Sequence, residues 1–149
     1  EDTILYIEPG KPFTGKKITA QKVFKQLRGT IKICDPYCGS GLLYFIHENV
    51  NKKSPVQILT KQVVDKPTGN FHAALKDLRS EGYKVEIKVY ASSILHDRYL
   101  LDNDNIWLSG NSFNDLGNKE SFIILLGNDI RQSVLATFDQ RWKSISTGI

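Results

Sequence analysis

The chain has 149 residues, of which 40% are hydrophobic and 24% charged, a size and composition that suit one domain with a buried core and exclude a disordered segment. Lys and Arg number 20 against 16 Asp and Glu, and the net charge of +4 favours anionic partners. No apolar run reaches the roughly 20 residues that cross a bilayer, and the acidic N-terminus is not a secretory signal, so we expect a cytoplasmic protein without a membrane partner.

The first half of the chain alternates short apolar runs with helical patterns. Residues 4–7 form an apolar run ended by Pro9-Gly10, which predicts an edge strand. In residues 18–29, apolar side chains recur at i, i+3, i+4 and i+7 before Gly29, which predicts a helix. The patterns that follow predict a strand over 30–36 that ends at Pro36, a helix over 39–50, a buried strand over 56–59 and a loop over 65–70.

The second half begins with a helical pattern over 71–82 that stops at Gly82, followed by period-2 alternation over 85–89, typical of a strand. Two more strands are expected over 95–101 and 106–108, joined by the tight segment 102–105. An apolar strand over 121–127 and a closing helix with apolar residues at four-residue steps complete the chain. This order predicts an α/β domain with a mixed β-sheet flanked by helices.

Residues 1–149 carry no repeat or linker and predict a single domain. The chain contains no Met and opens on Glu1, as expected for a domain cut from a longer protein, although a processed protein would look similar. The two cysteines, Cys34 and Cys38, are too few for a zinc site, which needs about four ligands. We expect two ordinary thiols rather than a redox pair, with no metal and no other cofactor.

Candidate catalytic residues gather in the stretch 94–115, ILHDRYLLDNDNIWLSGNSFND. In a strand over 95–101, His96 and Arg98 would project from the same face. A neutral imidazole beside a guanidinium that can grip two phosphate oxygens suits attack on phosphorus. A motif as short as H-x-R also recurs by chance on solvated strands, so the residues that follow decide between these interpretations.

The turn after the second strand of this stretch adds polar groups. Gly110 lets the backbone approach a ligand closely, and Ser112 and Asn114 offer neutral donors to phosphate oxygens. Glu120, just before the next strand, can orient an imidazole through its N–H. With the preceding histidine and arginine, these residues make a phosphoryl-transfer set that needs no metal.

The stretch resembles the signature of the phospholipase D superfamily, H-x-K-x4-D followed by G-S-x-N. His96 and Gly110 fall at the family positions, and Ser112 and Asn114 match if Asn111 is a one-residue insertion. The segments IKICDPY and VQILT also resemble the family's pattern, so the likeness covers most of the domain.

The resemblance implies a phospholipase D-like fold in which two signatures meet, one histidine forming a phosphohistidine while the other protonates the leaving oxygen. This chain has one signature, so the resemblance implies a homodimer with a shared active site built on His96 of each subunit. Glu120 resembles the family's later glutamate and would orient the histidine. The phosphate would be held by Arg98, Gly110, Ser112 and Asn114.

Two positions depart from the family pattern. Arg98 stands in place of the lysine, and Asn103 occupies the aspartate position, flanked by Asp102 and Asp104. Arg98 keeps the charge and the grip on phosphate, and a one-residue shift in the hairpin could recover the carboxylate. Either departure would also suit a relative that binds its ligand without turnover.

We therefore expect a metal-independent phosphodiesterase, an endonuclease acting on DNA rather than RNA, for instance the nuclease domain of a larger restriction or defence protein. Size and positive charge favour nucleic acid over lipid. A catalytically impaired nucleic-acid-binding or dimerisation module of the same fold is the first alternative, and a lipid phosphodiesterase is the second. Beside the site, Trp107 is expected in the core rather than stacked on a base, and Phe113 is expected to anchor its turn.

Overall fold

A mixed sheet organises the computed structural model, which describes residues 3–145 and 147–149. Within these ranges seven strands form the order β1-β9-β8-β7-β2-β4-β6. Their bounds are β1 (Ile4–Ile7), β2 (Ile31–Cys34), β4 (Val56–Thr60), β6 (Val85–Val89), β7 (Arg98–Leu101), β8 (Ile106–Ser109) and β9 (Ser121–Leu126). β2, β4 and β6 are parallel to one another, and the remaining neighbours pair antiparallel. Two short strands, β3 (Tyr37–Cys38) and β5 (Gln62–Val63), pair separately.

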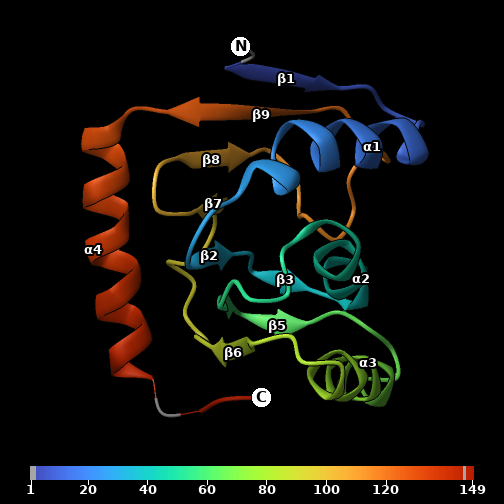
Figure 1. Cartoon of the computed structure of the whole chain (residues 1–149), viewed down its shortest axis with the longest axis vertical. Helices are drawn as coiled ribbons and strands as arrows, with labels where there is room; N and C mark the ends of the chain where they lie inside the picture. The colour runs from blue at the N-terminus through green and yellow to red at the C-terminus, as the bar shows by residue number, and fades with distance from the viewer. Residues whose placement is uncertain (1–2, 146) are drawn as a thin grey trace.

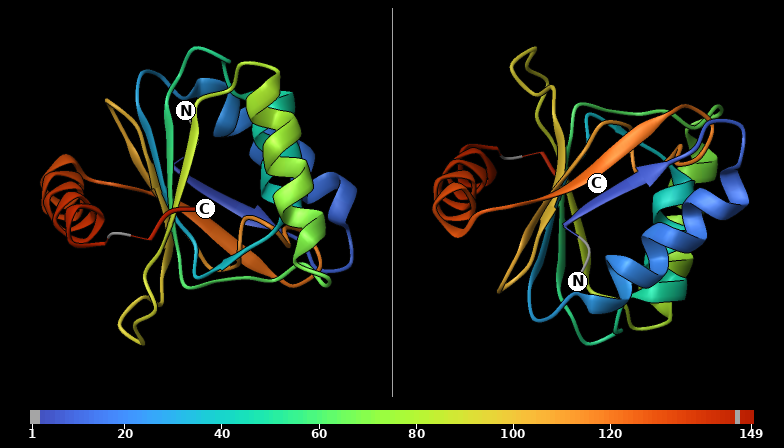
Figure 2. Two further views of the ribbon diagram at one scale, coloured as in Figure 1. Left: turned by 90° about the horizontal axis from the view of Figure 1, so that it is seen from below. Right: turned by 90° about the horizontal axis from the view of Figure 1, so that it is seen from above.

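Helices cover both faces of the sheet (Figures 1 and 2). α1 (Pro12–Lys22), the 3-10 helix η1 (Phe24–Gln26), α2 (Ser40–Asn49) and α3 (Gly69–Ser80) lie on one face, and α4 (Asn128–Ser144) lies on the other. The predicted α/β class, with a mixed sheet flanked by helices, is confirmed. None of the helices in the described ranges is both long enough and apolar enough to cross a membrane.

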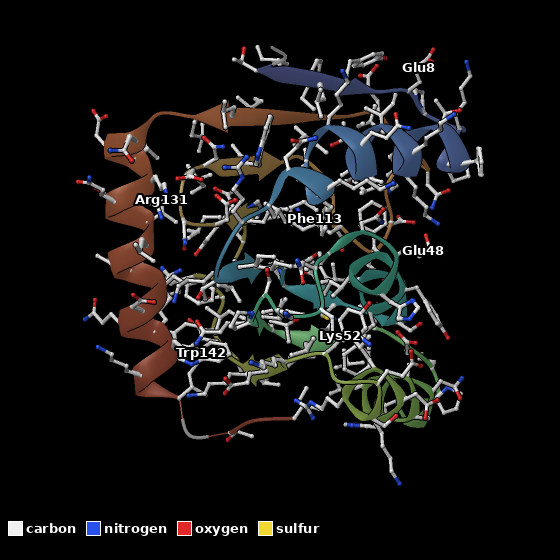
Figure 3. All side chains as sticks on the ribbon, in the orientation of Figure 1. Glu8, Glu48, Lys52, Phe113, Arg131 and Trp142 are labelled. Carbon is white, nitrogen blue, oxygen red and sulfur yellow. The ribbon has the colours of Figure 1, made fainter. Side chains whose placement is uncertain are left out.

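Two apolar clusters separate these layers. The larger cluster lies between the sheet and α1–α3 and includes Ile33, Leu100 and Phe113. The smaller lies under α4 and includes Tyr99 and Trp142. Trp142 and Arg131 project from α4 towards the sheet (Figure 3). Because successive residues of a strand face opposite sides, each inner strand contributes apolar side chains to both clusters.

Most predicted elements are confirmed, and the first helix is placed wrongly. The predicted helix over 18–29 in fact begins at Pro12 and ends at Lys22. Proline suits this first position because its fixed φ is already helical and it lacks only an N–H that would have no partner there. Val23 leaves the helical region, with φ of −123°, so the apolar residues after it are buried by a turn and η1.

The predicted strand over 95–101 is also too long. β7 begins only at Arg98, and the segment between β6 and β7 protrudes beyond the sheet without regular structure (Figure 2). The strand predicted over 30–36 likewise ends earlier, at Cys34, because the chain turns at Asp35 and pairs again as β3. Both errors lie at one end of the sheet.

The strand directions bring several turns together at that end. β7 is antiparallel to β2, so the start of β7 lies beside the end of β2, with Tyr99 opposite Cys34. β8 returns antiparallel to β7, which places Ser109 opposite Arg98. The residues that follow β2 and β8 therefore lie near Arg98 at the same end of the sheet.

Candidate functional site

Arg98 is the residue around which the site is built. As the first residue of β7, it shares a face with Leu100, towards α1–α3, while Tyr99 points to α4. Its Nε is buried and has no hydrogen-bond partner among the described residues. Its guanidinium carbon lies 5.7 Å from the centroid of the Tyr37 ring. A buried N–H without a partner is uncommon, because it loses water and gains nothing in return.

Asp35 is a fully buried carboxylate beside Arg98, and it holds the turn after β8 in place. Its Oδ2 accepts a hydrogen bond from Ser112 Oγ at 2.7 Å and another from the Phe113 N–H at 2.8 Å. Its Oδ1 accepts a hydrogen bond from the Tyr37 N–H at 3.1 Å. One side chain thus joins the end of β2 to a turn 77 residues further along the chain.

Burial raises the pKa of the Asp35 carboxyl above its ordinary value, because a charge is poorly solvated in the interior. The hydrogen bonds from Ser112, Tyr37 and Phe113, and the charge of Arg98, oppose the shift. The net direction is upward, so desolvation outweighs these four contacts.

A cavity of about 300 Å³ adjoins Arg98, and we call it the Arg98 pocket. Its charged groups are the guanidinium of Arg98, the exposed ammonium of Lys119 and the exposed carboxylate of Asp115. Asp115 is occupied by a hydrogen bond from the Asn118 amide. The pocket is lined by Tyr37, Val64, Arg98, Asn111, Ser112, Asn114, Asp115 and Lys119. Two cationic side chains that line one pocket, here Arg98 and Lys119, can bind an anion that has several oxygens.

Ser112 and Asn114 line the pocket as predicted, yet both already make structural contacts. Ser112 directs its hydroxyl proton to Asp35 and accepts the Asn114 N–H at 3.2 Å. Asn114 Oδ1 accepts the Leu42 N–H near the start of α2, at 3.2 Å. A Cβ added at Gly39 would lie 2.6 Å from the Asn114 amide, so only glycine leaves room for it there. The two side chains shape the pocket more than they supply free donors to it.

His96 is not brought to the Arg98 pocket, and the prediction that it projects together with Arg98 is wrong. Residues two apart share a face only within a strand, and β7 begins at Arg98, so His96 lies outside the strand. The imidazole is 83% exposed, and its Nδ1 lies 3.2 Å from the Asp97 carboxylate. It borders a different cavity, with Tyr99 and Val134, on the α4 side of the sheet.

Glu120 and Gly110 are also engaged elsewhere. Glu120 accepts a hydrogen bond from the Tyr6 hydroxyl of β1. It directly precedes β9 and, unlike its neighbour Lys119, is not among the residues that line the Arg98 pocket. The Gly110 N–H donates to the Phe122 carbonyl at 3.0 Å, which extends the β8–β9 pairing and removes this donor from any ligand.

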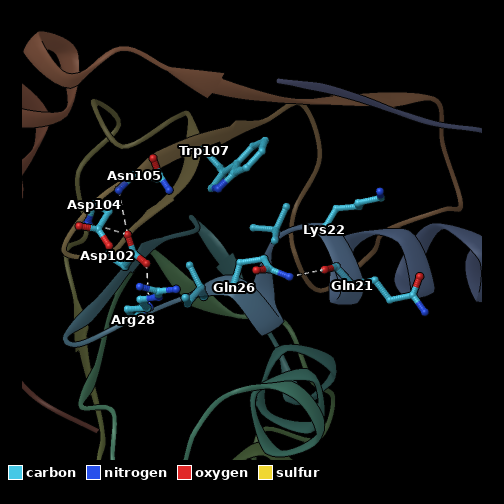
Figure 4. Close-up of a pocket in the computed structure, with 10 residues that line it drawn as sticks. Gln21, Lys22, Gln26, Arg28, Asp102, Asp104, Asn105 and Trp107 are labelled. Atoms are coloured by element: carbon cyan, nitrogen blue, oxygen red, sulfur yellow. Dashed lines mark hydrogen bonds between the residues drawn. The ribbon is translucent and has the colours of Figure 1, made fainter. Parts of the chain in front are cut away.

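Asp102, next to the aspartate position of the signature, stabilises the turn between β7 and β8. Asp102 is buried, and its carboxylate accepts hydrogen bonds from the backbone N–H groups of Arg28, Asp104 and Asn105 at 2.7–2.9 Å. Asp102 borders a separate cavity of about 450 Å³ (Figure 4), at the opposite end of β7 from Arg98. Asn103 is exposed, and neither residue contributes to the Arg98 pocket.

The predictions that Trp107 lies in the core and that Phe113 anchors its turn are confirmed, and both cysteines are buried. Cys34 and Cys38 are free and fully buried, and burial raises the pKa of Cys34 to about 12 and that of Cys38 further. Both thiols are therefore protonated and unreactive at neutral pH. Trp107 is buried in the larger cluster, and Phe113, 2% exposed, anchors the turn that follows β8.

Sequence reasoning missed Asp35 and Lys119. A signal for Asp35 exists, since a carboxylate directly after an apolar strand marks the end of that strand, where sites of α/β sheets collect. Lys119 carries no such signal, because a lysine in a polar turn is ordinary on a protein surface. Its place beside Arg98 follows from the path of the loop between β8 and β9.

No profile of a known protein family and no curated protein matches the sequence. Solved structures do match. One is TrmBL2, an archaeal chromatin protein whose structure is described as showing a novel mode of DNA binding; the TM-score is 0.63, with 11% identity over 97% of this chain. Another is polyphosphate kinase from Porphyromonas gingivalis, with a TM-score of 0.58 and 10% identity over 95% of this chain. The chain spans 53% of the first protein and 22% of the second, and at these identities the likeness establishes the fold alone.

Proposed function

We propose that this domain is a divergent relative of the phospholipase D superfamily that binds a phosphodiester of nucleic acid, DNA in preference to RNA, in the Arg98 pocket. The observation that carries the proposal is that Arg98, whose buried Nε has no partner among the described residues, lines a cavity together with Lys119. A phosphodiester offers two charged oxygens, which suit the planar fork of a guanidinium and a neighbouring ammonium.

Charge and the structural neighbours add support. The net charge of +4 favours a polyanion. One neighbour is described by its DNA binding and the other is named for polyphosphate, so both names imply phosphate-bearing partners. Binding is proposed ahead of cleavage because His96 borders a different cavity from Arg98.

Replacing Arg98 tests the proposal. Arg98→Ala is expected to weaken binding of a fluorescein-labelled DNA about 10- to 100-fold in an anisotropy titration at low salt, since a charge-assisted contact contributes about 1.5–3 kcal/mol. The DNA affinity of Arg98→Lys should lie between those of the wild type and of Arg98→Ala, because an ammonium keeps the charge but lacks the planar pair of donors of a guanidinium. A plot of the logarithm of the binding constant against the logarithm of the salt concentration should also become less steep by about one in Arg98→Ala.

Lys143→Ala is the matched control, because it removes one positive charge from the exposed surface of α4, on the other face of the sheet. Equal weakening by Arg98→Ala and Lys143→Ala would mean that net charge, and not the pocket, drives binding. Absence of binding by the folded wild-type protein would reject the proposal outright.

Cleavage of the phosphodiester through His96 is the second candidate function. It is favoured by the state of the imidazole, whose Nδ1 faces Asp97 while Nε2 has no partner among the described residues. An exposed nitrogen on a ring oriented by a carboxylate is suited to nucleophilic attack. In the homodimer expected for a single-signature chain, Nε2 of one subunit would attack phosphorus and the second histidine would protonate the departing oxygen. Water would then release the phosphate from the first histidine.

This candidate is tested by incubating plasmid and single-stranded DNA with the protein in excess EDTA and measuring the mass of the protein by light scattering. Cleavage that persists with the chelator, comes from a dimer and is lost in His96→Ala would support it. Cleavage that survives His96→Ala, or that EDTA abolishes, would exclude the mechanism. Phosphatidylcholine vesicles assayed in parallel separate a lipid phosphodiesterase from a nuclease.

A further inference from the structure

Lys and Arg residues without opposing Asp or Glu are concentrated in one stretch of the sequence. Residues 9–34 contain seven Lys and Arg and no Asp or Glu. The rest of the chain holds thirteen Lys and Arg against sixteen Asp and Glu, so the net positive charge of the whole protein originates in this stretch. α1 and η1 form its centre and present Lys16, Lys17 and Lys25 to solvent. Within the described ranges these three lysines form no ion pair, whereas Lys11 pairs with Glu8 at 3.2 Å.

An exposed aromatic ring lies among these lysines. Phe13, in the first turn of α1, is 80% exposed, the largest fraction for a large apolar side chain among the described residues. Lys16 and Lys17 follow it by three and four residues, which makes them its neighbours on the helix surface. Leaving a phenylalanine in water is unfavourable, and a ring flanked by ammonium groups matches a partner with flat apolar groups and negative charges.

Packing of the inner side of α1 against the rest of the protein holds the side that carries Phe13 and Lys17 towards solvent. A Cβ added at Gly15 would lie 2.8 Å from the Cα of Gly117, so the helix backbone packs directly on the loop between β8 and β9. Phe13 and Lys17 are each two residues from Gly15, about 200° around the helix, and therefore face away from that loop.

The same loop joins α1 to the Arg98 pocket. Gly10 N–H donates to the Asn118 carbonyl at 3.1 Å, and Lys11 N–H donates to the Gly117 carbonyl at 2.9 Å. Lys119, the next residue, lines the pocket. Figure 1 shows the first turn of α1 beside the segment that leads to β9. The basic helix is thus held at a fixed position relative to the proposed phosphate site.

We propose that the exposed face of α1, formed by Phe13, Lys16 and Lys17, is a second contact for single-stranded nucleic acid, and this inference rests on the function proposed for the Arg98 pocket. A strand held by one phosphate in the pocket continues over α1, where a base stacks on Phe13 and the two ammonium groups contact neighbouring phosphates. A single strand is favoured over a duplex because its bases are free to stack on a protein ring.

The test is anisotropy titration of a labelled 20-residue oligothymidylate and of an abasic strand of the same length. Phe13→Ala is expected to weaken oligothymidylate binding about 5- to 100-fold and to leave abasic binding unchanged, because only bases stack. Lys16→Gln combined with Lys17→Gln should weaken both ligands. Tyr44→Ala is the control, since Tyr44 is a 62% exposed aromatic residue on α2, and it should change neither affinity.

The outcomes separate this inference from the function on which it rests. If Arg98→Ala weakens binding and Phe13→Ala does not, the role of α1 is overturned and the pocket stands. If the wild-type protein binds neither strand, both proposals fall. Loss of binding to anionic phosphatidylglycerol vesicles in Phe13→Ala, with nucleic-acid binding intact, would reassign the face to a membrane surface and overturn the inference. Because Phe13 is exposed, its removal should leave the circular dichroism spectrum unchanged.

Discussion

Phe113→Ala is expected to lower the free energy of unfolding by about 3–5 kcal/mol, the usual cost of emptying a buried phenylalanine site. Phe113 is 2% exposed and lies edge-on to Phe24, with ring centroids 6.0 Å apart. Phe24 packs in turn edge-on against Phe45 of α2, at 4.5 Å. Figure 3 shows Phe113 in the interior of the molecule. Its removal would therefore break the chain of three aromatic rings that joins the loop after β8 to η1 and α2.

Urea unfolding followed by circular dichroism measures this loss. Phe113→Leu fills most of the space and should cost about 1.5 kcal/mol or less. Phe13→Ala is the matched surface control and should stay within about 0.5 kcal/mol of the wild type. Nucleic-acid binding by Phe113→Ala should also weaken, because the neighbouring Ser112 and Asn114 line the Arg98 pocket. A loss of stability no larger than that of Phe13→Ala would contradict the anchoring role.

Asp35→Ala is expected to destabilise the fold by about 2–4 kcal/mol, because the Phe113 N–H and the Ser112 hydroxyl would lose a buried charged acceptor. Asp35→Asn keeps an acceptor oxygen and should cost less. The measurement is urea unfolding of the three proteins at neutral pH. Equal stability of all three would mean that water replaces the carboxylate, and that Asp35 does not hold the turn.

The stability of the wild type and of Asp35→Asn should depend differently on pH. Since burial raises the pKa of Asp35 in the folded state above its ordinary value of 3.8, the folded protein binds a proton more tightly than the unfolded chain. The contribution of Asp35 to stability is therefore greatest below pH 3.8 and decreases as pH rises through the raised folded pKa. Asp35→Asn lacks this group, so its stability relative to the wild type should increase over that window.

Local patterns in the sequence were sufficient for much of the fold. The alternation over residues 85–89 and the apolar run over 121–127 predict β6 and β9, because the two faces of a strand are encoded by adjacent residues. The helices over 39–50 and 71–82 are predicted from apolar spacing and terminal glycines, and the structure confirms them within about two residues. The mixed sheet follows from the order of these elements.

The composition of the site was decided by contacts between distant parts of the chain. His96 and Arg98 are two residues apart, yet they border different cavities, because pairing with Ser109 and Cys34 stops at the start of β7. A period-2 pattern does not encode where pairing stops. Glu120 matches a sequence position of the signature, but its carboxylate accepts a hydrogen bond from Tyr6 of β1, a contact between residues 114 positions apart in the chain.

The mixed sheet flanked by helices, and the proximity of Arg98, Ser112 and Asn114, could be predicted from the sequence, since each depends on residues close in the chain or on a single hairpin. That Asp35 and Lys119 lie beside these residues became evident from the folded chain. The reason is physical: the Asp35 carboxylate is stabilised by a turn 77 residues away, and no local preference encodes that contact.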